Sequence, residues 1–331
     1  MARPATTLPH PLVAGATCVD LSVLVPVYNE QETLPELERR LEGVLDGLGL
    51  DCEVIAVNDG SADGTLALLR AWSGRDPRVR VIDFSRNFGH QAALYAALCR
   101  ARGRAVVLMD GDLQDPPEVI PHMVERWREG HEVVYAVRRK RKEGLLKRVA
   151  YAAFYRLLQR IAYLKIPLDS GGFSLLDHRV AAVLKGMPER NKFLRGLRTW
   201  AGFRQTSLLY ERDARYAGHT KYGLSKLFRL ALDGIVSYSY VPLRVSYAFG
   251  LVVSGMSFIL AVVYLFQKLF SAKYVPQGFT TLAILILFLG GVQLLTVGLL
   301  GEYVGRIYDE VKRRPDFVER ELIGFDGAGR R

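Results

Sequence analysis

The sequence predicts an α/β domain with a mostly parallel sheet, followed by amphipathic helices and two membrane-spanning helices. Two observations carry this prediction. Short apolar runs alternate with helix-like segments through the first part of the chain, and two long uncharged apolar stretches lie near its C-terminus. Such alternation is typical of a parallel sheet with helices on its faces. An apolar helix of roughly 20 residues is long enough to cross a bilayer.

The predicted strands are apolar and end in polar or glycine-rich residues. They cover 21–29, 52–61, 79–87 and 104–112. Segments with helical spacing lie between them, at 32–48, 65–74 and 89–102. Ligands of such sheets bind beyond the carboxyl ends of the strands. The polar residues that follow the strands are therefore the candidates for chemistry.

The two predicted spans are Val245–Gln267 and Val275–Gly301, neither of which contains a charged residue. Two spans place both ends of the chain on one side of the membrane. That side carries nearly all the Lys and Arg, so the positive-inside bias predicts a cytoplasmic domain on a multi-pass protein of the cytoplasmic membrane. Two long buried core helices are the alternative.

Two amphipathic segments with basic residues are predicted to lie in the membrane interface, at about 144–164 and at 221–244. Packing on the soluble domain is the alternative. The predicted organisation is a flexible leader at 1–19, a domain at 20–220, the juxtamembrane helix at 221–244, spans within 245–301 and a cytoplasmic tail at 302–331. The leader lacks the features of a cleavable signal peptide.

The composition indicates an anionic partner, because 45 Lys and Arg oppose 34 Asp and Glu and give a net charge of +11. Nucleic acid is not favoured as that partner, since the basic residues flank apolar helical stretches and no recognition motif is present. The 3 cysteines are widely spaced, which disfavours a disulfide framework or a zinc site.

The most informative string is VVLMDGDLQDPPE, in which an apolar strand is followed by Asp110, Asp112 and Gln114. Oxygen ligands at a strand end suit a hard divalent cation, and Mg²⁺ or Mn²⁺ commonly completes its shell with substrate phosphates. A solvated turn is the alternative for an isolated match. Placement after a buried strand favours the metal site.

Two further strand ends converge on the same predicted crevice. The first strand ends in Pro26, Tyr28 and Glu30, and the second is followed by Asp59 in the string NDGSADGT. Asp59 is placed to accept hydrogen bonds from a base or a ribose. Each end by itself is also compatible with ordinary turn and cap residues.

The strings VPVYNE, VNDGSADGT, SRNFGHQAAL and MDGDLQDPPE, in this order, resemble family 2 glycosyltransferases of the GT-A fold. The later segments AGHTKYGLSKLFRLALDGI and GEYVGRIYDEV are similar to the polyprenyl-phosphate branch of that family. That branch includes bactoprenol glucosyltransferases, aminoarabinose transferases and dolichol-phosphate mannose synthases. The resemblance covers roughly Asp20 to Arg313.

The resemblance implies roles by position. Pro26, Tyr28, Glu30 and Asp59 match residues that hold the donor nucleotide. Asp110, Asp112 and Gln114 match the group at the metal and the donor diphosphate, with Asp112 the surest ligand. Basic residues match the remaining positions, with Arg138 at the acceptor phosphate, Lys147 or Arg148 assisting it, and Arg215 and Lys221 near the donor phosphates or the acceptor.

One departure from the family pattern concerns Asp169. Members often read DxGDFR where this chain has Asp169-Ser170-Gly171-Gly172-Phe173-Ser174, so the second acid and the Arg are absent. Asp169 is therefore expected to orient the acceptor or a basic side chain, and a catalytic role for it is open.

The resemblance implies inverting transfer of a hexose from a nucleotide sugar, first of all UDP-glucose, to polyprenyl phosphate. Mannose, galactose and aminoarabinose are the alternative sugars, and the sequence leaves homo-oligomerisation open. A processive polysaccharide synthase is a competing reading, but it typically carries more spans and a QxxRW signature, where this chain has Leu197-Arg198-Thr199-Trp200. A non-catalytic scaffold would not need Asp110, Asp112 and Gln114 together.

Overall fold

The computed structural model describes residues 19–138, 170–190, 192–211, 241–270 and 278–325 of the 331. The chain divides into two units. The first comprises Met1–Arg141, Pro167–His219 and Pro315–Arg331, and the second Lys142–Ile166 and Thr220–Arg314. The predicted leader, the predicted interfacial helix at 144–164 and residues 212–240 lie outside the described residues.

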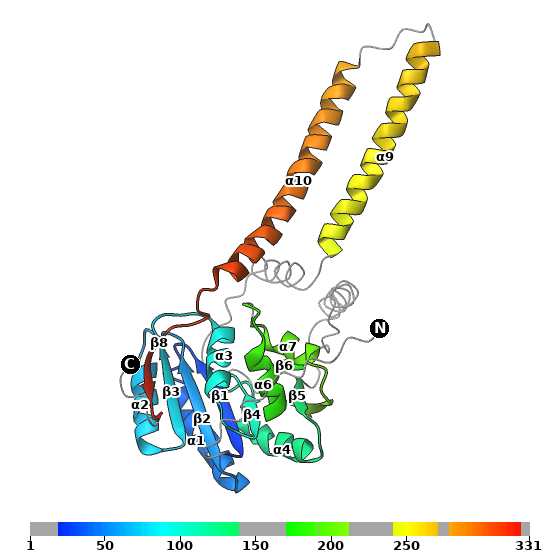
Figure 1. Cartoon of the computed structure of the whole chain (residues 1–331). Coiled ribbons are helices and arrows are strands. Elements are labelled where there is room, and N and C mark those ends of the chain that lie inside the picture. The colour runs from blue at the N-terminus through cyan, green and yellow to red at the C-terminus, as the bar shows by residue number, and fades with distance from the viewer. Residues whose placement is uncertain (1–18, 139–169, 191, 212–240, 271–277, 326–331) are drawn as a thin grey trace. The chain divides into compact units, whose positions relative to one another are not determined.

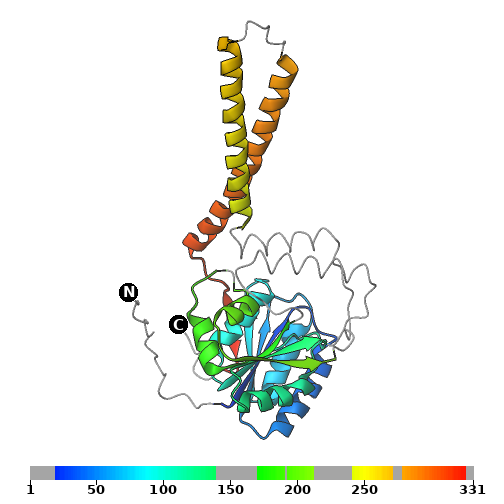
Figure 2. The ribbon, with the colours of Figure 1, turned by 90° about the vertical axis from the view of Figure 1, so that its right-hand side faces the viewer.

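The first unit is built on one sheet, which lies among its helices (Figure 2). Among the described residues this sheet has eight strands in the order β7-β5-β6-β4-β1-β2-β3-β8. The four adjacent strands β4, β1, β2 and β3 are parallel to one another. The strand β6 is antiparallel to β4 and β5, and β7 is parallel to β5. This confirms the predicted α/β class with a mostly parallel sheet. The strands are β1 (Leu21–Val27), β2 (Cys52–Asn58), β3 (Val79–Phe84), β4 (Ala105–Leu108), β5 (Val133–Arg138), β6 (Ser170–Asp177), β7 (Gln205–Tyr210) and β8 (Glu319–Ile323).

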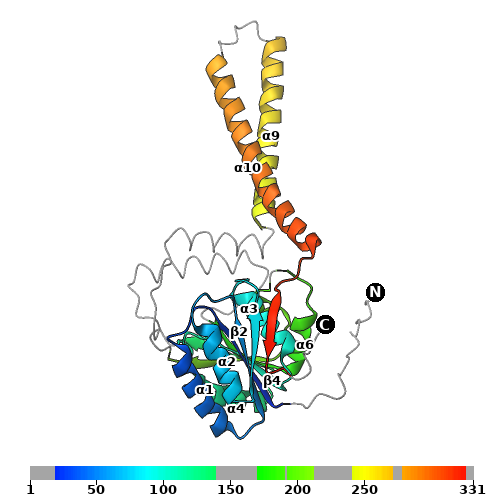
Figure 3. The ribbon, with the colours of Figure 1, turned by 90° about the vertical axis from the view of Figure 1, so that its left-hand side faces the viewer.

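Helices cover both faces of this sheet. Those of the first unit are α1 (Leu34–Leu48), α2 (Thr65–Arg75), α3 (His90–Arg100), η1 (Pro117–Val119), α4 (Ile120–Arg128), α6 (His178–Gly186) and α7 (Leu194–Trp200). The helices α1, α2 and α4 pack on one face, whereas α3, α6 and α7 pack on the other (Figure 3).

Alternation along β1 shows how the two cores form. Val23 and Val25 belong to the apolar cluster under α1, and Leu24 belongs to the cluster under α3. All seven residues of β1 are buried, because helices cover both faces of a central parallel strand. This double burial explains why the central strands read as continuous apolar runs in the sequence.

The C-terminal segment contributes an edge strand that the sequence did not predict. The strand β8 pairs antiparallel with β3, so a segment expected only as a tail extends the sheet (Figure 1). The strand has only five residues, ERELI, of which three are charged, and short charged strands are common at the edges of sheets.

The second unit contains two long helices, α9 (Val241–Phe270) and α10 (Phe279–Lys312). Ser246 of α9 and Thr296 of α10 are joined by a hydrogen bond of 3.3 Å between their hydroxyl oxygens. Within the described residues, one helix segment, Phe288–Lys312 of α10, meets the length and hydropathy of a membrane span, with a mean hydropathy of 1.3.

Candidate active site

The carboxyl ends of β1, β2 and β4 meet at one edge of the sheet, called the carboxyl edge below. Val27 at the end of β1 is in register with Asn58 at the end of β2, and Leu24 is in register with Leu108 of β4. The parallel pairing therefore brings together the loops that follow the three strands. These loops carry the candidate residues of the sequence analysis.

Gly111 sets how closely the loop after β4 approaches the end of β1. A Cβ atom at this position would lie 2.8 Å from Val27 Cγ1 and 3.0 Å from the carbonyl oxygen of Pro26. A side chain there would force the two segments apart. The glycine between Asp110 and Asp112 thus allows both acids to lie directly beside the end of β1.

The loop carrying Asp112 has a constrained backbone. Leu113 has a φ of 57°, in the region that residues with a side chain rarely adopt. The backbone N–H of Gln114 donates to Asp112 Oδ1 at 3.1 Å. The next residue, Asp115, is buried and accepts a hydrogen bond from the hydroxyl of Tyr210 at the end of β7. These contacts fix the position of Asp112 and Gln114, both of which are partly accessible.

His90 begins α3 and its Nε2 lies 3.3 Å from Asp110 Oδ1. The amino end of a helix carries partial positive charge and exposed backbone N–H groups, so it favours an anionic group nearby. In the sequence this histidine lies within the string SRNFGHQAAL, where no local pattern indicates a role for it. The spatial contact with Asp110 is what places it at the site.

Asp59 follows β2 and is 3% exposed. Its carboxylate accepts hydrogen bonds from the backbone N–H groups of Phe88, at 2.7 Å, and Gly89, at 3.0 Å. Gly89 has a φ of 97°, a conformation that favours glycine. Asp59 therefore holds the loop between β3 and α3 in place, and only its remaining lone pairs can serve a ligand.

Burial raises the pKa of the Asp59 carboxyl, and the hydrogen bonds from Phe88 and Gly89 offset this rise only in part. Removal of a carboxylate from water penalises its charged form, and backbone donors do not supply a compensating full charge. A buried acid with a raised pKa in a strand-end loop is typical of functional sites.

The loops after β1 and β2 are bonded to each other. Asn29 has a φ of 55°, its side-chain oxygen accepts from the amide of Ala62 at 2.9 Å, and its own amide donates to Ser61 Oγ at 2.9 Å. The amide of Glu30 donates to Thr65 Oγ1 at 2.9 Å. These hydrogen bonds hold the two loops together as one surface. Tyr28, which is 49% exposed, lies in the first of these loops.

The donor set at the carboxyl edge fits a divalent cation that shares its shell with a ligand. Within the described ranges, no three His, Cys, Asp or Glu residues form a group able to hold a metal ion by themselves. Asp110, Asp112 and Gln114 supply carboxylate and amide oxygens in one loop, and Mg²⁺ or Mn²⁺ commonly takes further ligands from phosphates and water. The residues present suit that incomplete protein shell.

The structure brings seven sequence-predicted residues to the carboxyl edge, namely Pro26, Tyr28, Glu30, Asp59, Asp110, Asp112 and Gln114. Arg138 ends β5, where its backbone is in register with Tyr210. Asp169, Lys147, Arg148, Arg215 and Lys221 lie outside the described residues. Their predicted roles at the acceptor and donor phosphates remain predictions.

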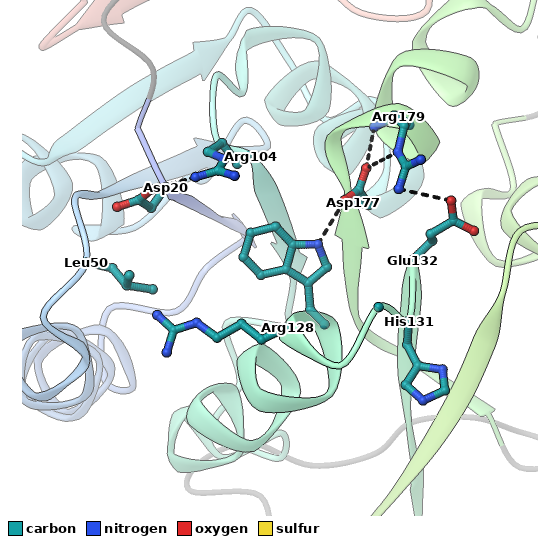
Figure 4. A pocket seen from close by; sticks show the side chains of 10 residues that line it. Asp20, Leu50, Arg104, Arg128, His131, Glu132, Asp177 and Arg179 are labelled. Carbon is teal, nitrogen blue, oxygen red and sulfur yellow. Dashed lines mark hydrogen bonds and ion pairs between the residues drawn. The ribbon is translucent and has the colours of Figure 1, made fainter.

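A cavity of about 360 Å³ lies at the opposite edge of the sheet, called the amino edge below (Figure 4). Several of its polar lining side chains are paired with one another. Trp127 Nε1 donates to Asp177 Oδ2 at 2.9 Å, and Arg179 lies within 3.1 Å of both Asp177 and Glu132. None of the sequence-predicted site residues lines this cavity.

Comparison with known proteins gives matches over most of the chain. Residues 22–184 match the family model described as glycosyl transferase family 2. The uncharacterized glycosyltransferase YkcC of Bacillus subtilis is 45% identical over 93% of this chain and 95% of its own length.

Two further relatives carry a more specific description. The bactoprenol glucosyl transferase of Shigella phage SfII is 42% identical over 90% of this chain and 96% of its own length. The prophage bactoprenol glucosyl transferase homolog of Escherichia coli is 40% identical over 91% and 99%. A solved glucosyl-3-phosphoglycerate synthase of Mycobacterium tuberculosis is 21% identical, with a TM-score of 0.43 over 66% of this chain and 78% of that one.

Proposed function

Because the chain belongs to glycosyl transferase family 2, we propose that it transfers glucose from UDP-glucose to the phosphate of a polyprenyl lipid, bactoprenol phosphate. The observation that carries this proposal is the carboxyl edge. Asp110, Asp112 and Asp59 follow the ends of β4 and β2 there, in a chain that is 42% identical to a bactoprenol glucosyl transferase over 90% of its length.

The reaction is a direct displacement at the anomeric carbon of glucose. A phosphate oxygen of the lipid forms the new bond to that carbon, while the bond to the donor diphosphate breaks on the opposite face and UDP leaves with the electron pair. The configuration at the carbon is inverted. A phosphate monoester has a second pKa near 6, so the nucleophile is already ionised at neutral pH and requires no dedicated base.

Asp110, Asp112 and Gln114 would hold the divalent cation, which stabilises negative charge on the leaving diphosphate when it is bound. The constrained backbone at Leu113 and the bond from Gln114 to Asp112 keep the ligand oxygens in place before the substrate arrives. Such preorganisation means that little reorganisation is needed during the reaction.

The loops of Pro26, Tyr28, Glu30 and Asp59 would receive the nucleotide. Their mutual hydrogen bonds fix the surface against which the donor lies, and exposed Tyr28 offers a ring to the uracil base. The amino end of α3, beside Asp110, would face the diphosphate. Orientation of this kind accounts for a large part of the rate gain in bimolecular transfers.

Basic residues would form the binding site for the acceptor phosphate. Arg138, assisted by Lys147 or Arg148, would bind the lipid phosphate, with Arg215 and Lys221 near the phosphates and Asp169 orienting the acceptor. The helices α9 and α10 would both span the cytoplasmic membrane, with the sheet domain on the cytoplasmic side and amphipathic segments at the interface.

The experiment is a transfer assay on membranes that contain the full chain. Radiolabelled UDP-glucose, UDP-galactose and GDP-mannose are each supplied with polyprenyl phosphate and Mg²⁺ or Mn²⁺, and the lipid is extracted. We expect label from UDP-glucose in a lipid that mild acid hydrolyses to free glucose. Label in long polymer would favour a processive synthase, and label only from another nucleotide sugar would change the donor.

A further inference from the structure

After α10 the chain returns to the sheet domain. Residues 315–325, called the C-terminal clasp below, include β8 and lie along β3 (Figure 1). The amide of Ser85, just after β3, donates to the carbonyl oxygen of Val318 at 3.0 Å. The clasp therefore contacts the point where β3 passes into the loop that precedes α3.

Aromatic packing joins the clasp to that loop. Phe317 stacks on Phe84 at the end of β3, with ring centroids 5.2 Å apart and an interplanar angle of 12°. Phe84 in turn meets Phe88 edge to face at 5.6 Å. The backbone N–H of Phe88 is the closest donor to Asp59. One continuous set of contacts thus runs from the clasp to the predicted nucleotide loop.

A second connection is polar and begins at Arg320. Its Nε donates to Asp83 Oδ2 at 2.7 Å, and Asp83 Oδ1 accepts from Asn58 Nδ2 at 2.7 Å. Asp83 is fully buried, whereas the side chain of Arg320 is 53% exposed and covers the carboxylate from outside. A buried carboxylate is costly unless it is paired, so Asp83 depends on both partners.

Asn58 transmits this contact to the site. It is the last residue of β2 and immediately precedes Asp59, and its side-chain oxygen accepts from the amide of Ser61 at 3.3 Å. Rotation of the Asn58 amide would break the bond to Asp83, the bond from Ser61, or both. The polar and the aromatic connections therefore reach the Asp59 loop from two sides.

We infer that Arg320 is a positioning residue for the donor site, which holds the Asp59 loop through Asp83 and Asn58. The inference rests on the proposed function in assigning that loop to the nucleotide. The clasp follows the second long helix directly in the chain, so the segment that leaves this helix also completes the donor site. The competing explanation is that Arg320 and β8 only cover the backbone of β3, which would otherwise be the outermost strand on that side of the sheet.

The test compares variants of the full chain in membranes. Arg320→Ala removes the partner of Asp83, Arg320→Lys keeps the charge without the planar guanidinium, and the double change Arg320→Ala/Asp83→Asn removes the buried charge together with its partner. Asn at position 83 still offers an acceptor to Asn58. Arg70→Ala is the matched control, because Arg70 of α2 forms an exposed ion pair with Glu321, the residue that follows Arg320 in β8.

Two readouts are combined. The first is KM for UDP-glucose and for polyprenyl phosphate, and the second is hydrogen exchange of the Phe88 and Gly89 amides that bond to Asp59. Arg320→Ala should raise KM for UDP-glucose about tenfold, the order expected for a lost charge-assisted bond, with KM for the lipid unchanged. The two amides should exchange faster. The double variant should return KM for UDP-glucose and the exchange of the two amides most of the way to the wild-type values. Arg320→Lys should return them part of the way, and Arg70→Ala should behave like wild type.

If Arg320 only helps β8 to cover β3, the variants should give different KM and exchange results. Arg320→Ala would then lower thermal stability but leave both KM values and the exchange of Phe88 and Gly89 unchanged, and this result would overturn the inference. Equal rises in both KM values would overturn it as well. If UDP-glucose is not a substrate, the proposed function fails, and the exchange of the two amides still decides whether Arg320 controls the Asp59 loop.

Discussion

Asp59 at the carboxyl edge and Asp177 at the amino edge are both buried carboxylates of the same sheet, but their pKa values shift in opposite directions. Burial raises the pKa of Asp59, and the hydrogen bonds from its backbone N–H partners offset this rise only in part. Burial also acts on Asp177, but hydrogen bonds from Trp127 and Arg179 outweigh it and lower the pKa of that carboxyl.

The opposite pKa shifts distinguish the acid that we propose for the donor site from an acid that stabilises the fold. Folding makes ionisation of Asp59 less favourable than it is in the unfolded chain, so this residue costs stability at neutral pH, whereas Asp177 contributes stability there. A cost of this kind is common at functional sites. The cavity lies at the amino edge, where Asp177 and Glu132 are paired with Arg179. The described cavity and the proposed donor site therefore lie at opposite edges of the sheet.

The largest expected effect follows from Asp112→Asn at the carboxyl edge. The amide is a weaker ligand for a hard cation, so stabilisation of the leaving diphosphate would be lost. We expect the rate of glucosyl transfer to fall at least about 100-fold, since metal stabilisation of a transition state supplies several kcal/mol. The assay is initial transfer rate in membranes. Asp177→Asn serves as the control, and a similar loss in both variants would erase the distinction between the two edges.

A smaller effect is expected from Asp59→Asn. One side-chain oxygen is replaced by an NH₂ group, which cannot accept from the amide of Phe88 or Gly89. Loss of a hydrogen bond to a charged group costs about 1.5–3 kcal/mol, so KM for UDP-glucose should rise roughly 10- to 100-fold. KM for the lipid serves as the internal control. A variant with normal KM for the donor would place Asp59 outside the nucleotide site.

Asp177→Asn should instead change stability with a defined pH dependence. The lowered pKa of Asp177 contributes stability above the unfolded value of about 3.9, and this contribution disappears as the pH falls through the folded value. The difference in Tm between wild type and variant should be largest near neutral pH and vanish in acid. Thermal unfolding in detergent across this range measures it. A difference that grows in acid would contradict the assignment.

The smallest effect concerns Cys52, which begins β2 near the amino edge. Burial raises the pKa of its thiol to about 11, so almost no thiolate is present at neutral pH. Iodoacetamide at pH 7.5 should leave Cys52 unmodified in the folded protein and modify it after denaturation, as read by mass spectrometry of peptides. Rapid labelling of the native protein would show that this end of the sheet opens.

The sequence predicted those parts of the fold that depend on local pattern. The strands β1 to β4 are buried on both faces, so they appear as apolar runs, and the acids Asp110 and Asp112 are recognisable because they follow such a run. The strand β8 escaped prediction. It is short, charged and paired on one side to β3, which is far away in the sequence.

Parts of the site that depend on tertiary pairing also escaped prediction. Arg320 meets Asp83 across 237 positions, and Tyr210 meets Asp115 across 95. Neither partner has a local pattern that distinguishes it from a solvated side chain. His90 lies within the family-like string SRNFGHQAAL, but its contact with Asp110 follows only from the placement of α3 beside β1.

Calorimetric titration of UDP into the full chain, with and without Mn²⁺, tests the functional difference between the two edges most directly. Wild type and Asp177→Asn should bind UDP more tightly when Mn²⁺ is present. In Asp112→Asn the affinity for UDP in the presence of Mn²⁺ should fall at least about tenfold. Changes even to residues that only support metal ligands lower metal affinity about 10- to 100-fold. Metal-dependent UDP binding that survives in Asp112→Asn and disappears in Asp177→Asn would contradict the account.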